Sequence, residues 1–308
     1  MRIVFFGTSE FSVAILEKLI SDFFYPVLVV SQPDRPAGRK QILTAPPVKH
    51  VCETHRIPLL QPERVIDALA AIEKAKPDLI ITASYGQIIP LSVLQSAALG
   101  AINVHTSLLP KYRGASPIQS AILAGDTETG ITIMNMDAGM DHGPILLQKA
   151  LSIGDEETAV SLHSRLATLG ADMLAKCLPD YASGRLKPVP QDHRAATFCK
   201  LIKKEDARIQ WSSDAVDIGR KVRAYFDWPC AWTILPNGKR LKILHARPFQ
   251  GEEKNALPGR MSIEENRVFV DGLYGKLELL DLQVEGKERM TAAVFARGYH
   301  QLSGQVCE

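Results

Sequence analysis

Cysteine is scarce in this chain, and the few cysteines form no motif. Five cysteines are spread over 308 residues, and none belongs to a Cys-x-x-Cys pair. This pattern gives neither a zinc site nor a disulfide framework, and it is typical of proteins in a reducing cytosol. We expect the five thiols to be buried apolar side chains, and we predict no metal site.

Long hydrophobic runs and an excess of one charge are also missing. No apolar stretch reaches the roughly 18 residues that a membrane-spanning helix needs. The apolar amino-terminal run leads into Gly7-Thr8-Ser9-Glu10 rather than a small-residue cleavage site, which argues against a signal peptide. The formal net charge of +2 excludes a strongly basic nucleic-acid coat protein but allows a local basic patch. We therefore predict a cytoplasmic protein with no membrane partner.

What the sequence does contain is the composition of a globular protein of about two domains. Hydrophobic residues make up 46% and charged residues 23%, which excludes disordered, collagen-like and coiled-coil chains. Apolar runs typical of buried strands alternate with helical patterns in the first half of the chain, and a long amphipathic helix over about 158–182 closes it. The runs are Arg2–Phe6, Val27–Val30, Asp78–Thr82, Ala101–Val104 and Ile131–Met134, and helical patterns include Glu63–Lys76 and Pro117–Leu123. This alternation predicts an α/β fold, Rossmann-like, with a mostly parallel sheet and helices on both faces.

The composition changes after this half. Residues 185–204 are basic and contain proline, which is typical of a linker. Beyond them a helix over Ala215–Tyr225 precedes short strand-like runs separated by turn signals, which predicts a small β-barrel or sandwich. The predicted domains are therefore a catalytic domain over 1–184, a linker over 185–204 and a β domain over 205–308.

The first strand–helix turn, Gly7-Thr8-Ser9-Glu10, lacks the glycine pattern of dinucleotide-binding proteins. A dinucleotide cofactor is therefore disfavoured. The chemistry of the chain is indicated instead by Asn103 and His105, two residues apart at the carboxyl end of a predicted strand, where open α/β sheets bind ligands. An amide donor and an imidazole on the same face suit a developing oxyanion and a proton transfer, and Asp141, in a glycine-flanked loop, could orient His105. On residue types alone, a capped strand end is the favoured interpretation, since Asn-x-His is a common pattern.

The stretch Asn103-Val-His105-Thr-Ser-Leu-Leu-Pro-Lys-Tyr-Arg-Gly114, followed by Asp137-x-Gly-x-Asp141-x-Gly-Pro144, resembles the 10-formyltetrahydrofolate-dependent formyltransferases. The resemblance extends along the chain, from Phe5-Phe6-Gly7-Thr8 to Lys204–Trp211, to members of that family that formylate the methionine of initiator tRNA. It implies a transfer of the formyl group from 10-formyltetrahydrofolate to the α-amine of initiator methionyl-tRNA, for translation initiation. It also implies an oligonucleotide-binding (OB-like) barrel at the carboxyl end, no metal, no obligate protein partner and a monomer.

The resemblance also implies roles for individual residues. Asn103, His105 and Asp141 would be catalytic: Asn103 and a protonated His105 would bind the oxyanion, and Asp141 would raise the basicity of His105 and take the amine proton through a water. The implied folate-binding residues are Tyr85, Gly86, Gln87, Ile88, Ser107, Leu108, Leu109, Pro110, Asp137 and Gly139.

A long, proline-bounded basic loop runs from Asp34 to Lys49. The resemblance implies that it meets the acceptor stem of the tRNA, through Arg35, Arg39, Lys40 and Lys49. A solvated loop without this role is the alternative, and the linker after Arg185 could equally contact the tRNA or solvent. Two other functions stay open: an amino-sugar-nucleotide formyltransferase, which this basic loop disfavours, and a non-catalytic folate- or tRNA-binding module, which the complete trio disfavours. A hydrolase of the formyl donor is disfavoured because such proteins usually carry a further large domain.

Overall fold

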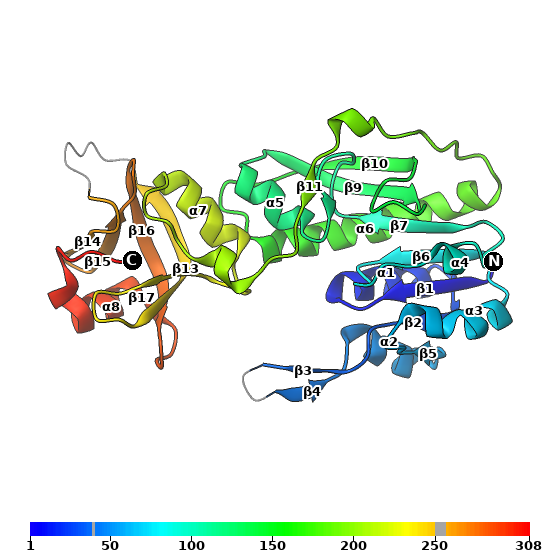
Figure 1. Ribbon diagram of the computed structural model, residues 1–308, viewed down its shortest axis with the longest axis horizontal. Coiled ribbons are helices and arrows are strands. Elements are labelled where there is room, and N and C mark those ends of the chain that lie inside the picture. The colour runs from blue at the N-terminus through cyan, green and yellow to red at the C-terminus, as the bar shows by residue number, and fades with distance from the viewer. Residues whose placement is uncertain (39–40, 250–256) are drawn as a thin grey trace. The chain divides into compact units, whose positions relative to one another are not determined.

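The computed structural model describes residues 1–38, 41–249 and 257–308, and these form two compact units (Figure 1). Unit 1 consists of Met1–Pro117, Glu128–Ser152 and His163–Cys199; unit 2 consists of Ile118–Thr127, Ile153–Leu162 and Lys200–Glu308. The sequence-based bounds of the two domains and their linker stay a prediction.

A seven-stranded sheet forms the centre of unit 1, in the order β10-β9-β7-β6-β1-β2-β5 (Figure 1). The strands from β7 to β5 are parallel, and β9 and β10 pair antiparallel at one edge. The mostly parallel sheet is therefore confirmed. The strands are β1 (Ile3–Gly7), β2 (Pro26–Val30), β5 (Leu59–Leu60), β6 (Leu79–Ala83), β7 (Ala101–His105), β9 (Glu128–Asn135) and β10 (Ile145–Ser152).

Helices cover both faces of this sheet. On one face, Val4, Phe6 and Ile80 share a buried cluster with side chains of η1, α3 and α4. On the other face, the helical residue Gly170 lies so close to Val104 that an added Cβ would come within 3.0 Å of it, which explains a glycine inside a helix there. The helices from the amino terminus to Ala182 are α1 (Glu10–Ser21), α2 (Pro47–His55), η1 (Val65–Ala68), α3 (Leu69–Ala75), α4 (Leu91–Leu94), α5 (Pro117–Ala124) and α6 (Ala159–Ala182).

Two segments of unit 1 differ from the sequence-based expectation. The predicted helix over Glu63–Lys76 begins as the 3₁₀ turn η1 and becomes α-helical only at Leu69. The predicted basic loop contains a two-stranded antiparallel hairpin, β3 (Arg35–Ala37) and β4 (Ile42–Thr44), in which Ile42 and Leu43 are 62% and 66% exposed. A pattern search for buried strands misses such a hairpin because its side chains point into solvent.

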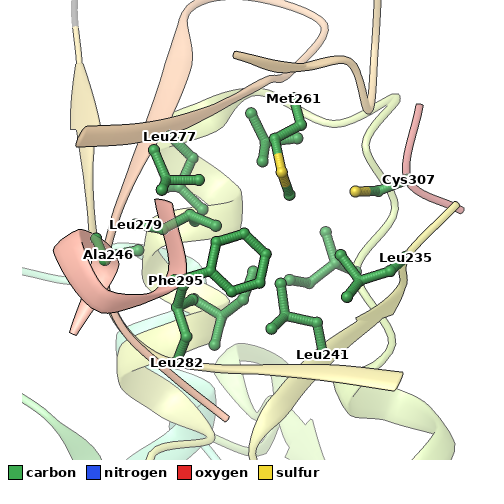
Figure 2. Close-up of a cluster of buried hydrophobic side chains, with 14 of the residues drawn as sticks. Leu235, Leu241, Ala246, Met261, Leu277, Leu279, Leu282, Phe295 and Cys307 are labelled. Carbon is green, nitrogen blue, oxygen red and sulfur yellow. The ribbon is translucent and has the colours of Figure 1, made fainter. Parts of the chain in front are cut away.

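Unit 2 contains an antiparallel sheet in the order β12-β13-β16-β15-β14, with β17 paired to β16. The predicted β fold of the carboxyl-terminal part is thereby confirmed, and its sheet is antiparallel. Phe295 lies in its core among aliphatic side chains such as Leu241, Leu279 and Leu282 (Figure 2). The strands are β12 (Ala231–Ile234), β13 (Arg240–Phe249), β14 (Met261–Glu264), β15 (Arg267–Asp271), β16 (Lys276–Val284) and β17 (Met290–Thr291); the helices are η3 (Lys204–Ala207), α7 (Ala215–Ala224), α8 (Ala292–Tyr299) and η4 (His300–Leu302).

The carboxyl-terminal tail connects the two edge strands of this sheet. Ile234 of β12 exchanges two backbone hydrogen bonds with Glu308, of 3.1 and 2.9 Å. Met261, the first residue of β14, donates to the carbonyl of Gln305 at 2.8 Å, and Cys307 donates to that of Gly259 at 2.8 Å. The edges of the sheet are therefore joined through the tail.

All five cysteines are buried and free, as predicted. Burial raises the pKa of the Cys52 thiol to about 11 and that of the Cys307 thiol to about 12, so neither is a thiolate at neutral pH. No helix in the described part of the chain is both long enough and apolar enough to cross a membrane.

Candidate active site

Three polar side chains meet beside strand β7. Asn103 and His105 are two residues apart on this strand and therefore project from the same face of the sheet. Both reach Asp141: the Asn103 amide nitrogen Nδ2 lies 3.4 Å from Asp141 Oδ1, and His105 Nδ1 lies 3.6 Å from the same oxygen. The structure thus brings together the three residues that the sequence nominated for catalysis. His105 is 6% exposed and the Asp141 side chain 15%, so the carboxylate is largely shielded from water.

The hydrogen bonds of His105 define its tautomer. His105 Nε2 lies 3.0 Å from the carbonyl oxygen of Tyr112, which can only accept, so Nε2 carries the proton. In the neutral ring Nδ1 is then the basic nitrogen, and it faces Asp141. A proton taken up by His105 therefore arrives between the imidazole and the carboxylate.

Asp141 sits in a loop whose backbone is constrained. Its φ of +48° lies in the left-handed region, which non-glycine residues seldom adopt. The backbone N–H of Gly114, in the short strand β8 (Arg113–Gly114), donates to Asp141 Oδ2 at 2.8 Å. The second carboxylate oxygen is thereby held, while Oδ1 remains toward Asn103 and His105.

Behind this loop lie two residues to which sequence reasoning gave no role. Arg113 and Gln191 are 4% and 5% exposed. The guanidinium donates to Gln191 Oε1 at 3.1 and 2.6 Å, and Gln191 Nε2 donates to the carbonyls of Asp141 and Gly143 at 3.0 and 2.7 Å. Arg113 stands within the motif of the formyltransferases. Gln191 lies in the predicted linker, where no motif or spacing indicated a functional residue.

The segment around Gln191 is packed against the site. Its strand β11 (Phe198–Cys199) pairs with β8, and the 3₁₀ turn η2 (His193–Ala195) follows Gln191 closely. The His193 ring stacks on His142 with ring centres 4.1 Å apart, and His142 Nδ1 lies 2.7 Å from Asp137 Oδ2. Asp137 also accepts from the N–H of Gly139 at 2.9 Å. Residues 137–143 therefore form a hydrogen-bonded loop that packs against the segment containing Gln191 and His193.

The segment Ser107–Pro110 is fixed by Thr132 of β9. The Thr132 hydroxyl donates to the carbonyl of Ser107 at 2.6 Å and accepts from the N–H of Leu109 at 3.1 Å. Gln148 donates to the Leu109 carbonyl at 2.7 Å. Leu109 is buried, and Leu108 and Pro110 are partly exposed.

The segment Tyr85–Ile88 follows β6. The Tyr85 ring is 2% exposed and packs edge-on against Phe6, and burial raises the pKa of its hydroxyl to about 12. The Tyr85 side chain therefore belongs to the core, and the Tyr85 carbonyl accepts from the Thr8 hydroxyl at 2.8 Å. Gly86 has a φ of +90°, a conformation that glycine permits. Gln87 accepts from the Val65 N–H at 3.0 Å, whereas Ile88 is 91% exposed and available to a ligand.

Of the four predicted tRNA contacts, two can be placed. Arg35 forms an exposed ion pair with Glu63 at 2.6 Å, and Lys49 forms a half-buried ion pair with Asp34 at 2.8 Å. Hydrogen bonds from Lys49 and Gln61 hold the pKa of Asp34 below its ordinary value. Lys49 therefore anchors the base of the β3–β4 hairpin. Arg39 and Lys40 lie outside the described residues. In the described ranges, no group of three or more His, Cys, Asp or Glu side chains could hold a metal ion.

Comparison with known proteins identifies the class. A family model described as formyl transferase matches residues 1–178, and one described as formyl transferase, C-terminal domain, matches residues 201–300. The chain belongs to the formyl transferase family and is an enzyme of that class.

Its relatives carry a more specific name. The chain is 45% identical, over 97% of its length and 95% of the relative's, to the methionyl-tRNA formyltransferase of Halalkalibacterium halodurans. It is 41% identical to the methionyl-tRNA formyltransferase of Staphylococcus epidermidis over 99% of both chains. A solved structure of WlaRD, a sugar 3N-formyl transferase, in the presence of dTDP and 5-N-formyl-THF, covers 94% of this chain and 99% of that one with a TM-score of 0.69 at 18% identity, a likeness in fold.

Proposed function

We propose that this enzyme transfers the formyl group of 10-formyltetrahydrofolate to the α-amine of methionyl initiator tRNA, giving formylmethionyl-tRNA and tetrahydrofolate. The identity of 41–45% to methionyl-tRNA formyltransferases over nearly full length supports this acceptor. For the chemistry, the observation that carries the proposal is the convergence of Asn103, His105 and Asp141 within 3.4–3.6 Å.

The three side chains take complementary roles in this proposal. A bound N10-formyl group supplies the electrophilic carbon that the amine attacks. Asn103 donates from Nδ2 to the formyl oxygen as negative charge develops there, and His105, protonated at Nδ1, donates into the same space; a donor of this kind contributes about 2.7–4 kcal/mol. Asp141 takes the proton of the attacking amine, directly or through a water, and stabilises the imidazolium by its charge. The proton then leaves Asp141 for the departing folate nitrogen.

The surroundings of the trio suit a folate-sized donor. Two apolar side chains on the loops beside it are exposed, Ile88 to 91% and Met140 to 62%. Exposed apolar side chains near a few convergent polar groups are typical of small-molecule sites. We propose that Tyr85–Ile88, Ser107–Pro110, Asp137 and Gly139 wall this donor, with Tyr85 contributing through its backbone. The relation to a sugar formyl transferase solved in the presence of 5-N-formyl-THF supports a formylated folate as donor.

The acceptor contacts are proposed more broadly. Arg35 is the first residue of β3 and Lys49 lies in α2, just after the β3–β4 hairpin, and we propose that these two residues bind tRNA phosphates together with Arg39 and Lys40. Such contacts make affinity depend steeply on salt concentration. Domain bounds near residues 184 and 205, cytoplasmic localisation and a monomeric state belong to the same proposal.

A formylation assay with labelled donor tests the function. The proposal expects transfer to methionyl initiator tRNA and much less to methionyl elongator tRNA or to an amino-sugar nucleotide. Transfer to the sugar nucleotide alone would replace the proposed acceptor. His105→Ala should lose about 10²- to 10⁴-fold in kcat with the fold retained by circular dichroism; unchanged kcat would refute the role given to His105.

A further inference from the structure

Gln191 is a buried amide with every hydrogen-bonding position occupied. Its oxygen accepts two N–H groups of Arg113 and its nitrogen donates to two backbone carbonyls, those of Asp141 and Gly143. An amide has two acceptor and two donor positions, so none is left unpaired. Such complete satisfaction is needed at a site that is only 5% exposed, and it specifies one orientation of the side chain.

These bonds form a closed ring of hydrogen bonds that includes Asp141, Gln191, Arg113 and Gly114. Gln191 holds the backbone carbonyl of Asp141 at 3.0 Å, and Arg113 holds Gln191. The next residue, Gly114, holds Asp141 Oδ2 through its N–H at 2.8 Å. Backbone and side chain of Asp141 are therefore tied to the same two-residue strand, one directly and one through Gln191.

Arg113 strengthens this ring because its guanidinium is charged. In the described part of the chain its acceptors are uncharged: Gln191 Oε1 and His193 Nδ1, the latter at 2.9 Å. Hydrogen bonds from a charged donor are shorter and stronger than neutral ones. The 2.6 Å bond to Gln191 fits that description.

We propose that Gln191 is a positioning residue for formyl transfer, which aims the Asp141 carboxylate at His105 and Asn103. The inference rests on the proposed role of Asp141. The separations of 3.4 and 3.6 Å leave little room for drift, and a misplacement of about 1 Å can cost about 100-fold in rate. The segment predicted as a linker is in this view part of the catalytic unit.

Gln191→Glu separates positioning from packing. The carboxylate has nearly the same shape and can still accept from Arg113, but it offers no N–H to the carbonyls of Asp141 and Gly143 and repels them. We expect kcat to fall about tenfold or more, with KM for the donor and for tRNA within about twofold, because only the alignment of Asp141 changes. The neighbouring exposed variant Asp192→Asn is the matched control and should keep wild-type kcat.

The deciding measurement is the same substitution in an Asp141→Asn background, followed by single-turnover formylation. If Gln191 acts through the Asp141 carboxylate, Gln191→Glu adds less than about twofold in that background. An equal fall in both backgrounds, or no fall in the wild-type background, overturns the proposal. Wild-type activity of Asp141→Asn alone would instead refute the role proposed for Asp141.

Thermal denaturation monitors folding of each variant. If Gln191→Glu does not fold, Gln191→Met, which keeps length and volume without hydrogen bonds, replaces it in the same cycle and should give the same non-additive loss. If neither variant folds, Gln191 supports the fold as a whole and the positioning role is refuted.

Discussion

Two carboxylates of this enzyme are shielded from water but have different hydrogen-bonding partners. Glu278, in β16 of unit 2, is 6% exposed and accepts from Arg247 and Arg267, each at 2.7 Å. Asp141, in unit 1, is 15% exposed and has no Lys or Arg within ion-pairing distance among the described residues; its partners are an amide, an imidazole and a backbone N–H.

The two settings suit two different roles: a structural one for Glu278 and, in the proposed mechanism, proton transfer for Asp141. Hydrogen bonds from Arg267 and Arg247 hold the pKa of Glu278 below its ordinary value, so its charge is fixed at neutral pH. Asp141 faces an imidazole at 3.6 Å, with which, in the proposed mechanism, it shares the handling of a proton, whereas the amide of Asn103 only donates a hydrogen bond.

The largest expected effect comes from neutralising Asp141. Asp141→Asn keeps an acceptor oxygen for Gly114 but cannot take a proton, so kcat should fall about 10²- to 10⁴-fold. Single-turnover formylation and thermal denaturation measure rate and stability together. The control Asp180→Asn, in α6, removes an exposed charge that pairs with Arg185 and should leave kcat unchanged. A large loss of stability with little loss of rate would show that Asp141, like Glu278, serves the fold rather than the reaction.

Glu278→Gln should have the converse result. It weakens the bonds to Arg247 and Arg267, which are about half exposed and can turn to water. We expect the free energy of unfolding to fall by about 1–2 kcal/mol, with kcat unchanged. Urea denaturation measures this, beside the exposed control Glu288→Gln, which should stay within about 0.5 kcal/mol of wild type.

The pH dependence of stability sharpens the same contrast. Because the pKa of Glu278 is lower in the folded state, its contribution is present above the unfolded pKa of about 4.3 and is lost as the pH falls through the folded pKa. The melting temperature of Glu278→Gln should therefore decline less steeply than that of wild type on acidification from pH 6 to 3. Parallel declines would show that Glu278 carries none of the acid sensitivity.

The smallest effect is expected at an exposed carboxylate. Glu63 pairs with Arg35 at 2.6 Å, but both side chains are more than half exposed. Glu63→Gln should change the free energy of unfolding by less than about 0.5 kcal/mol, since exposed pairs contribute little. If urea denaturation showed a destabilisation above about 1 kcal/mol, solvent exposure would not determine how much such a carboxylate contributes to the free energy of unfolding.

Much of the fold follows from local sequence patterns. The apolar runs that become β1, β6 and β7 are fully or mostly buried, and a short continuous apolar run in the sequence predicts such a strand. β10 gave no such signal, because it is an edge strand with mostly exposed or half-exposed side chains. The spacing of Asn103 and His105 sufficed to put them on one face.

The residues that hold the site residues in place could not be predicted from sequence patterns. Gln191 bonds to a carbonyl 50 residues earlier in the chain, and backbone acceptors leave no mark on the identity of the residues that carry them. Arg113 reads as a surface charge by type, and only the structure shows it to be 4% exposed. The proximity of Asp141 to His105, by contrast, was predicted, from the glycine-flanked loop and from the motif of the formyltransferases.

The tail that joins β12 and β14 has a practical consequence for handling the protein. Removing Gln305–Glu308 would leave the N–H and C=O groups of Ile234 in β12 and the N–H of Met261 in β14 without these partners. Open sheet edges recruit strands from other molecules and so promote aggregation. Purification tags and fusion partners should therefore be placed so that Gln305–Glu308 keep their hydrogen bonds to β12 and β14.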